Sequence, residues 1–267
     1  MTTQITTEEF NKFKKLIYDA AGISMAISKK ILISSRLLSR VQHFKCSSFE
    51  EYYQLITSGQ HPKEFQHVVD LLTTNETYFF REIKHFDLLK NKILPEHGKR
   101  RFRLWSAASS SGEEAYSLAM LLSDQLGNNP WEIHATDISS RVVEQAKKGV
   151  YPIEAQDKIP EEYLIKYCLK GVRAQKGTLL IDKKLRLRVS FKQLNLNGAW
   201  PPDELFDVIF LRNIMIYFDT PTKKTLVNRL IRQLRPGGYL FIGHAESLNT
   251  VTNKLKTVQP SVYQKPI

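Results

Sequence analysis

Cysteine is nearly absent from this sequence, which has only Cys46 and Cys168 among its 267 residues. The two stand in neither a disulfide framework nor a metal-ligand spacing. Long apolar runs are absent as well, and the N-terminus has no basic segment followed by an apolar one. We therefore expect a soluble, unexported protein of the reducing cytoplasm without a bound metal. A chain of this length buries about three-quarters of its unfolded surface and needs no disulfides.

Acidic residues are outnumbered by basic ones, 27 against 39, which gives a formal net charge of +12. The excess is concentrated in two stretches of the chain. Residues 11–46 hold eight Lys or Arg against the single acid Asp19, and residues 166–192 hold nine against Asp182. A field of this sign favours an anionic partner, which leaves nucleic acid, a membrane surface and an acidic protein open.

The first 74 residues carry the periodicity of short amphipathic helices, the first of which Thr6 opens with a capping box. On the second helix Lys29, Arg36 and Arg40 are spaced by seven and four residues, which places them on one stripe. We predict a small all-helical domain over residues 1–74. Its helices are expected near residues 7–21, 28–44, 48–57 and 62–72.

Beyond residue 100 the pattern changes to strands that alternate with helices. This alternation predicts an α/β fold with a doubly wound, mainly parallel sheet, in a domain over residues 75–267. Two apolar runs at residues 178–181 and 185–189 predict an antiparallel hairpin, and with it an inserted β subdomain over about residues 168–190. The strands of the main sheet are expected near residues 102–105, 131–137, 189–194, 208–211, 239–242 and 257–263.

Polar side chains follow the apolar run Val208–Leu211, whose lack of alternation predicts a strand buried on both faces. Arg212 and Asn213 come at its carboxyl end, and Asp137 ends another predicted strand. Because open α/β sheets bind ligands at the carboxyl ends of their strands, we expect these side chains to share a site. The turn Ser106–Glu114 lacks a phosphate-binding motif and ends in two carboxylates, which favours a cationic ligand.

Several segments together resemble the chemotaxis receptor glutamate methyltransferase (CheR) family, in the same order and across nearly the whole chain. The segments around Asn75 and Asn213 are highly specific, whereas LRPGG is shared by many methyltransferases. Ala115 departs from the family, which usually has proline there, and the turn before it is richer in serine. The segments are Asn75–Glu82, Trp105–Ser117, Ala135–Ile138, Phe206–Asp219 and Leu234–Gly238 with Gly243–Ser247.

The resemblance implies a Rossmann-like methyltransferase that uses S-adenosylmethionine, leaves S-adenosylhomocysteine and methylates the γ-carboxylate of glutamates on a chemoreceptor. If the roles of matching residues in the family hold here, Glu114 contacts the methionine portion of the donor and Asp137 its ribose. Asn195 and Leu196 would flank the adenine. The further residues that the resemblance places at the donor or the substrate are Asn75, Thr77, Arg81, Arg212 and Asn213.

The implied acceptor needs no general base. A free glutamate has a pKa of about 4.3, so at neutral pH its carboxylate is already the nucleophile. What remains is alignment for in-line displacement, and positioning alone supplies roughly 7 to 11 kcal/mol of a barrier. We assign Arg81 to hold the acceptor carboxylate and Tyr217 to line the methyl-transfer position. The alternatives are a surface ion pair for Arg81 and a core position for Tyr217, and we expect His244 to be structural.

The resemblance also implies partners. The stripe of Lys29, Arg36 and Arg40 is expected to dock on the acidic methylation helices of a chemoreceptor, and the basic hairpin is a second candidate contact, for the receptor or its C-terminal tail. We expect a monomer that binds no nucleic acid. Two other hypotheses stay open. One is an RNA methyltransferase, against which the sequence has no amine-methylating motif, catalytic cysteine pair or RNA-binding module, and the other is a non-catalytic sensor of donor or receptor.

Overall fold

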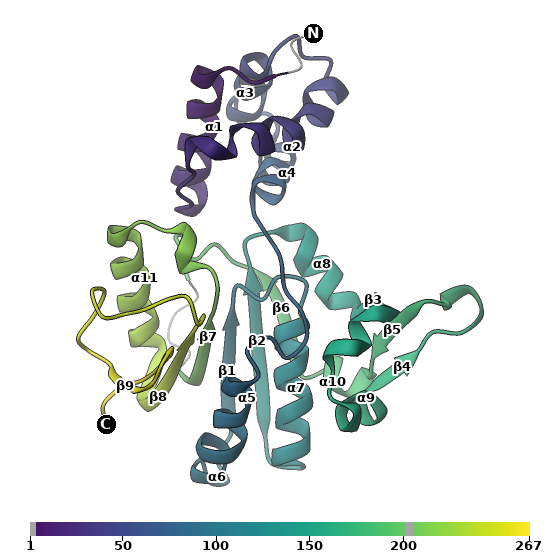
Figure 1. Ribbon diagram of the computed structural model, residues 1–267, viewed down its shortest axis with the longest axis vertical. Coiled ribbons are helices and arrows are strands. Elements are labelled where there is room, and N and C mark those ends of the chain that lie inside the picture. Colours follow the sequence, from purple (N-terminus) through teal and green to yellow (C-terminus); the bar gives the residue numbers. More distant parts are fainter. Residues whose placement is uncertain (1–3, 201–204) are drawn as a thin grey trace.

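The computed structural model describes residues 4–200 and 205–267, and it shows a helical body joined to a larger α/β body (Figure 1). Residues 1–3, with which the predicted helical domain starts, lie outside the described part. The four predicted helices are present, and a 3-10 turn begins the second. No helix in the described ranges is long and apolar enough to cross a membrane. The elements are α1 (Thr7–Ala21), η1 (Ile27–Lys29), α2 (Lys30–His43), α3 (Phe49–Thr57) and α4 (Pro62–Leu72).

The helical body is held by one buried carboxylate as well as by its apolar core. Glu64 on α4 is only 7% exposed. Arg40 on α2 donates to both its oxygens, at 2.8 and 2.6 Å, and the Tyr52 hydroxyl of α3 donates at 2.5 Å. Burial opposes the charge of Glu64, but these hydrogen bonds bring its pKa below the usual value. Arg40 therefore joins α2 to α4, although the sequence placed it on the docking stripe.

The α/β body contains a seven-stranded sheet in the order β6-β2-β1-β7-β8-β10-β9, parallel from β6 through β8. Neighbouring residues of one strand belong to opposite cores: Leu104 packs with α7 on one face and Trp105 with α11 on the other. This two-sided burial explains the continuous apolar runs of the central strands. The strands are β1 (Phe102–Ala107), β2 (Trp131–Asp137), β6 (Val189–Gln193), β7 (Phe206–Leu211), β8 (Leu234–Ile242), β9 (Lys256–Gln259) and β10 (Val262–Gln264).

Helices cover both faces of this sheet, so the predicted doubly wound architecture is confirmed (Figure 1). The long helix after the linking segment contains a π-helical stretch, η2 (Leu89–Ile93), which precedes Pro95. The helices are α5 (Lys84–Leu88), α6 (Leu94–Glu96), α7 (Glu113–Leu126), α8 (Ser140–Lys148) and α11 (Thr220–Gln233), with the 3-10 turn η5 (Met215–Tyr217).

The inserted antiparallel sheet exists, but one of its two predicted strands is wrong. Residues 185 and 186 of the predicted strand lie in the helical turn α10 (Lys183–Arg186), whose start is capped by the Asp182 side chain, which accepts a hydrogen bond from the Lys184 N–H at 2.7 Å, and Val189 already belongs to β6. Leu185 is buried whereas Leu187 is 76% exposed. The sheet has the order β3-β5-β4. Its elements are β3 (Val150–Pro152), η3 (Ile153–Lys158), α9 (Glu161–Tyr167), β4 (Cys168–Lys170), η4 (Arg173–Gln175) and β5 (Thr178–Ile181).

The C-terminal segment also differs from its prediction, because a single strand was expected at 257–263 and two are found. The chain reverses between β9 and β10 at Pro260 and Ser261, and Ser261 has a positive φ of 63°. A left-handed backbone at a serine is uncommon and has no signature in the apolar pattern. The reversal makes β10 antiparallel to β8 and leaves β9 at the edge of the sheet.

Polar contacts fix the helical body on the α/β body. Asp70 at the end of α4 accepts hydrogen bonds from the Ser140 N–H, the Ser140 hydroxyl and the Arg141 N–H, which satisfies the first turn of α8. Tyr18 of α1 donates to Asp219 at 2.7 Å. Helices of one body therefore cap and contact helices of the other, and the space between the two bodies has a defined shape.

Replacing Arg40 with glutamate is expected to lower the free energy of unfolding by about 3 to 5 kcal/mol, because two carboxylates then face each other near Tyr52. Urea denaturation at neutral pH measures the effect. Lys14→Glu, at an exposed position of α1, is the control and should stay within about 0.5 kcal/mol of the wild type. Since the pKa of Glu64 is lowered, the contribution is present above the unfolded pKa and is lost as the pH falls through the folded one. An unchanged Arg40→Glu stability at neutral pH would contradict the assignment.

Candidate active site

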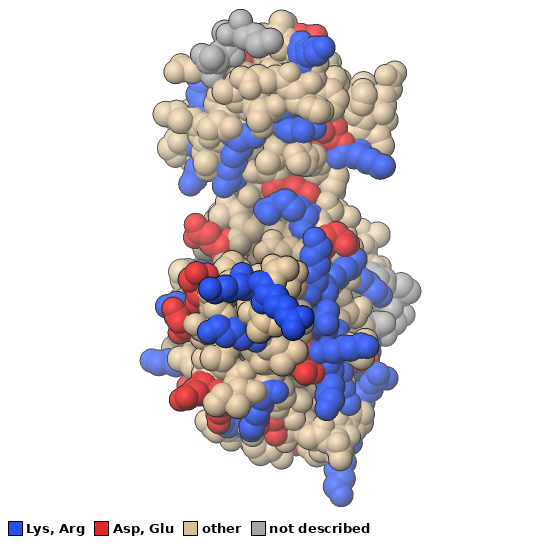
Figure 2. All heavy atoms as spheres, turned by 90° about the vertical axis from the view of Figure 1, so that its right-hand side faces the viewer, with Lys and Arg blue, Asp and Glu red and all other residues tan. Residues whose placement is uncertain are grey.

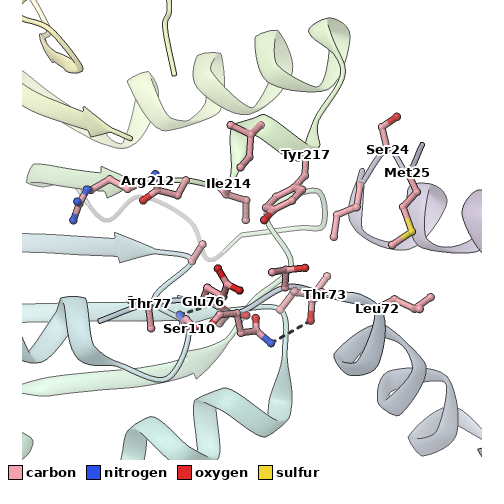
Figure 3. A pocket seen from close by; sticks show the side chains of 18 of the residues that line it. Ser24, Met25, Leu72, Thr73, Glu76, Thr77, Ser110, Arg212, Ile214 and Tyr217 are labelled. Carbon is pink, nitrogen blue, oxygen red and sulfur yellow. Dashed lines mark hydrogen bonds between the residues drawn. The ribbon is translucent and has the colours of Figure 1, made fainter. Parts of the chain in front are cut away.

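A cavity of about 570 Å³ lies where the helical body meets the carboxyl end of the sheet (Figure 3). Its walls come from the start of α2, from the linking segment 73–81, and from the ends of β1, β2 and β7. Most residues predicted for the donor, for catalysis or for docking line this one cavity. They are Lys29, Arg36, Asn75, Thr77, Arg81, Glu114, Asp137, Arg212, Asn213 and Tyr217.

Three residues singled out in the sequence do not line the cavity. The Asn195 side chain donates to the Ala20 carbonyl at 2.6 Å, and so contacts the last turn of α1. Leu196 is 8% exposed and packs in the core on the α11 face of the sheet. Arg40 is held by Glu64 within the helical body. The predicted adenine contacts thus lie outside the cavity wall, and their role stays a prediction.

Arg212 is the centre of the polar network beside the cavity. Its side chain is 2% exposed and forms ion pairs with Glu82 and Glu114, each at 2.9 Å. It also donates to the backbone carbonyl of Arg81. The second carboxylate oxygen of Glu114 accepts from the Ser106 hydroxyl at 2.7 Å. Two carboxylates share one guanidinium, so the cluster carries a net charge of −1 inside the protein.

Glu82 is a site residue that the sequence analysis did not assign. Burial opposes its charge, but Arg212 brings its pKa below the usual value. Its Oε1 accepts from the Asn213 side chain and from the His244 N–H, both at 3.2 Å. Glu82 has a positive φ of 59°. Glu82 ends the family-specific segment NETYFFRE, and this was the signal from which it could have been assigned. Its left-handed backbone has no signature in the residue pattern.

The loop after β7 is held by a second unassigned acid, Glu246. Its Oε2 accepts from the N–H groups of Asn213 and Gly243, at 3.1 and 2.7 Å, and its Oε1 from that of Ile216. Burial raises the pKa of Glu246. Glycine at position 243 permits this close approach, because a Cβ there would lie 2.5 Å from the side-chain amide nitrogen of Asn213 and 2.9 Å from its backbone nitrogen. These contacts give Asn213 its positive φ of 57° and orient it toward Glu82.

Asp137 ends β2 beside the small-residue turn. Its carboxylate accepts from the backbone N–H groups of Ser110, at 2.8 Å, and Ser139, at 3.0 Å. Burial raises the pKa of Asp137, and the two hydrogen bonds oppose that rise. Each carboxylate oxygen has a further acceptor site, so Asp137 can still accept hydrogen bonds from ligand hydroxyl groups.

Arg81 and Tyr217 line the same cavity from different segments. Arg81 donates to the Glu76 backbone carbonyl at 3.0 Å and lies over the Tyr78 ring, 5.7 Å from its centroid. Among the described residues, Arg81 forms no side-chain ion pair, which was the alternative to its role at the acceptor. Tyr217 is half-buried, and its carbonyl accepts from the Ser24 N–H at 2.8 Å, which ties η5 to the helical body. Figure 3 shows the Tyr217 ring pointing into the cavity.

His85 lies behind this network, fully buried. Burial lowers its pKa to about 3, and the positive charge of Arg212 adds to the effect, so the ring is neutral at neutral pH. Its ring lies 4.8 Å from that of His244, centroid to centroid. The sequence analysis did not single out His85, because a lone histidine in a helical segment carries no distinctive signal.

Arg212→Met is expected to lower the free energy of unfolding by about 3 to 5 kcal/mol, because Glu82 and Glu114 then lose their shared counter-charge in a buried site. Thermal and urea denaturation measure the loss. Lys15→Met, which removes an exposed ion pair with Asp19, is the matched control and should leave stability nearly unchanged. Equal effects of the two substitutions would contradict a central role for Arg212.

Two family profiles match the chain. That of the CheR methyltransferase all-alpha domain matches residues 8–73, and that of the CheR methyltransferase SAM-binding domain matches residues 75–264. The chain is also similar to the chemotaxis protein methyltransferase of Escherichia coli K12, with 37% identity over 97% of this chain and 91% of that protein. The similarity to chemotaxis protein methyltransferase 2 of Pseudomonas aeruginosa is 39% identity, over 97% and 93%.

A third relative, the chemotaxis protein methyltransferase of Borreliella burgdorferi, is 37% identical over 99% of this chain and 96% of that protein. These matches span both bodies and both walls of the cavity. The protein therefore belongs to the CheR methyltransferase family.

Proposed function

We propose that this protein transfers a methyl group from S-adenosylmethionine to the side-chain carboxylate of glutamates on a chemoreceptor, in the cytoplasm. The product would be a glutamate methyl ester. The observation that carries the proposal is the convergence of ten side chains, singled out from the residue pattern or from the family resemblance, on one cavity at the carboxyl end of the sheet. The size of that cavity, about 570 Å³, falls within the range of ligand sites.

The charges of the cavity fit the proposed donor. The amino-acid end of S-adenosylmethionine carries an ammonium and a carboxylate, and Glu114 and Arg212 offer one partner for each. Asp137 suits ribose hydroxyl groups, because its remaining acceptor sites lie at the end of β2. When bound, the donor would supply an electrophilic methyl group on a sulfonium.

The chemistry needs positioning rather than proton transfer. An acceptor glutamate is ionised at neutral pH, so Arg81 would hold its carboxylate and Tyr217 would line the path between the carboxylate and the methyl carbon. Both side chains line the cavity, and the backbone of Tyr217 contacts Ser24 of the helical body. Arg81 can turn from the Glu76 carbonyl to an incoming carboxylate, since a charge-assisted pair is the stronger hydrogen bond.

Docking of the receptor is proposed at the helical body. Lys29 is exposed and lines the cavity, whereas Arg36 donates to the carbonyls of Leu71 and Thr73, each at 3.1 Å, at the end of α4. Lys29 is therefore the member of the predicted stripe whose charge is available to an acidic helix. Figure 2 shows a second gathering of Lys and Arg on the side that carries the inserted sheet, where Lys170, Arg173, Lys176, Lys183 and Lys184 are exposed.

Mass spectrometry of chemoreceptors incubated with the protein and S-adenosylmethionine tests the activity. We expect a mass increase of one methylene on glutamate that mild alkali removes, as for an ester. Tyr217→Ala should slow the reaction with little effect on folding. Total RNA with labelled donor is the parallel incubation. Label in RNA alone would support the competing RNA hypothesis, and no label in either would support the sensor hypothesis.

Lys29→Glu is expected to raise the KM for the receptor several-fold, because it places a negative charge against an acidic helix. The Kd for S-adenosylhomocysteine, measured by calorimetry, should stay unchanged. Lys14→Glu makes the same charge change on α1, away from the cavity, and serves as the control. A change in donor affinity without a change in receptor KM would contradict docking at Lys29.

A further inference from the structure

Glu82, His85 and His244 form a cluster behind the proposed donor cavity, and one ligand atom from each lies within 4.8 Å of the others. His85 comes from α5, Glu82 from the segment before it, and His244 from the turn after β8. The His85 side chain is fully buried, and its Nδ1 has no hydrogen-bond partner in the part of the chain that the structure describes. Buried polar atoms are nearly always paired, so this one requires an explanation.

The hydrogen bonds of Ser261 determine which nitrogen of His85 carries the proton. The Ser261 hydroxyl donates its single proton to the Pro260 carbonyl at 2.6 Å. It must therefore accept from His85 Nε2, which lies 2.8 Å away. The other ring nitrogen, Nδ1, is buried and makes no hydrogen bond to the described residues. It faces Glu82 Oε2 at 3.5 Å, which is long for a hydrogen bond but close to the separation of two ligand atoms on one metal ion.

A cation between these atoms gives Nδ1 a partner, in contrast to the expectation from the sequence of a protein without a bound metal. We propose that Glu82, His85 and His244 bind a Zn²⁺ ion through Oε2, Nδ1 and Nε2. Two imidazoles and one carboxylate form a ligand set that suits zinc, with the fourth position open to water beside the exposed His244. The His85–Ser261 hydrogen bond is the kind of contact that fixes the tautomer of a zinc-bound histidine.

The distances agree with such a site after a small movement. Bonds of 2.0 to 2.2 Å in a tetrahedral site place neighbouring ligand atoms about 3.4 Å apart. Glu82 Oε2 lies 3.5 Å from His85 Nδ1 and 3.9 Å from His244 Nε2. His244 has to approach His85, and its side chain is 47% exposed and able to rotate. The His244 backbone N–H already donates to Glu82 Oε1, so the turn after β8 is held next to the carboxylate that would bind the ion.

The surrounding charge permits a divalent ion. Arg212 is close and repels cations, but Glu82 and Glu114 together outweigh it and give the cluster a net charge of −1. Glu82 Oε2 faces two nitrogens of Arg212, Nη2 at 2.9 Å and Nε at 3.3 Å, so the ion shares this oxygen with the guanidinium. Through Glu82, the zinc site adjoins Arg212 and Asn213 at the cavity wall.

Calorimetric titration of Zn²⁺ into the full chain, without a histidine tag and after treatment with a chelator, tests the proposal. We expect one ion per chain and a binding constant that His244→Ala weakens at least about tenfold. Titration with Co²⁺ should give the strong visible absorption of a four-coordinate site, and His244→Ala should abolish it. His43→Ala removes an exposed histidine of α2 and should leave both readouts unchanged.

Ser261→Ala probes the tautomer without removing a ligand. It frees the proton to move to Nδ1 and is expected to weaken Zn²⁺ binding by about 10- to 100-fold. Circular dichroism verifies that each variant is folded. The proposal is overturned if the wild type binds no Zn²⁺, or if His43→Ala and His244→Ala have equal effects. It is also overturned if Ser261→Ala binds as tightly as the wild type.

Discussion

The buried guanidinium of Arg212 is the interaction on which the site depends. It joins the segment that leaves the helical body, through Glu82, to the helix that follows the first strand, through Glu114. Each of these charges would be costly to bury alone, and together they are satisfied. Asn213 and the turn after β8 then take their positions from Glu82 and Glu246. The wall of the cavity is thus assembled from polar groups that need one another.

Much of the fold follows from local signals. The capping box at Thr6, which was recognised in the sequence, begins α1, and Gly22 with its left-handed backbone ends it. The run Val208–Leu211 indicated a central strand because it is apolar on both faces. The prediction of a strand at 185–189 was wrong, because its apolar pattern alternates and is a weaker signal than a continuous run. The Asp182 side chain accepts a hydrogen bond that starts a helical turn, and this local cap outweighs the weak periodicity.

The residues of the site could be predicted more readily than their partners. The ends of parallel strands meet at one edge of a sheet, so Asp137, Arg212 and Asn213 were expected to be neighbours, and they are. The contacts of Arg40 with Glu64 and of Asn195 with Ala20 were not predictable, since the first depends on how α2 packs on α4 within the helical body and the second on how the two bodies meet. The left-handed backbones of Glu82 and Asn213 likewise depend on tertiary contacts.

The segment at residues 73–83 both connects the two bodies and lines the cavity. Its length is therefore constrained twice, by the distance that it spans and by the cavity whose wall it forms. A surface linker tolerates insertions and lets recognition domains be exchanged between proteins, whereas this one does not. Within this architecture, substitutions on the surface of the helical body leave the cavity intact, whereas grafting a different domain in its place would rebuild the cavity wall as well.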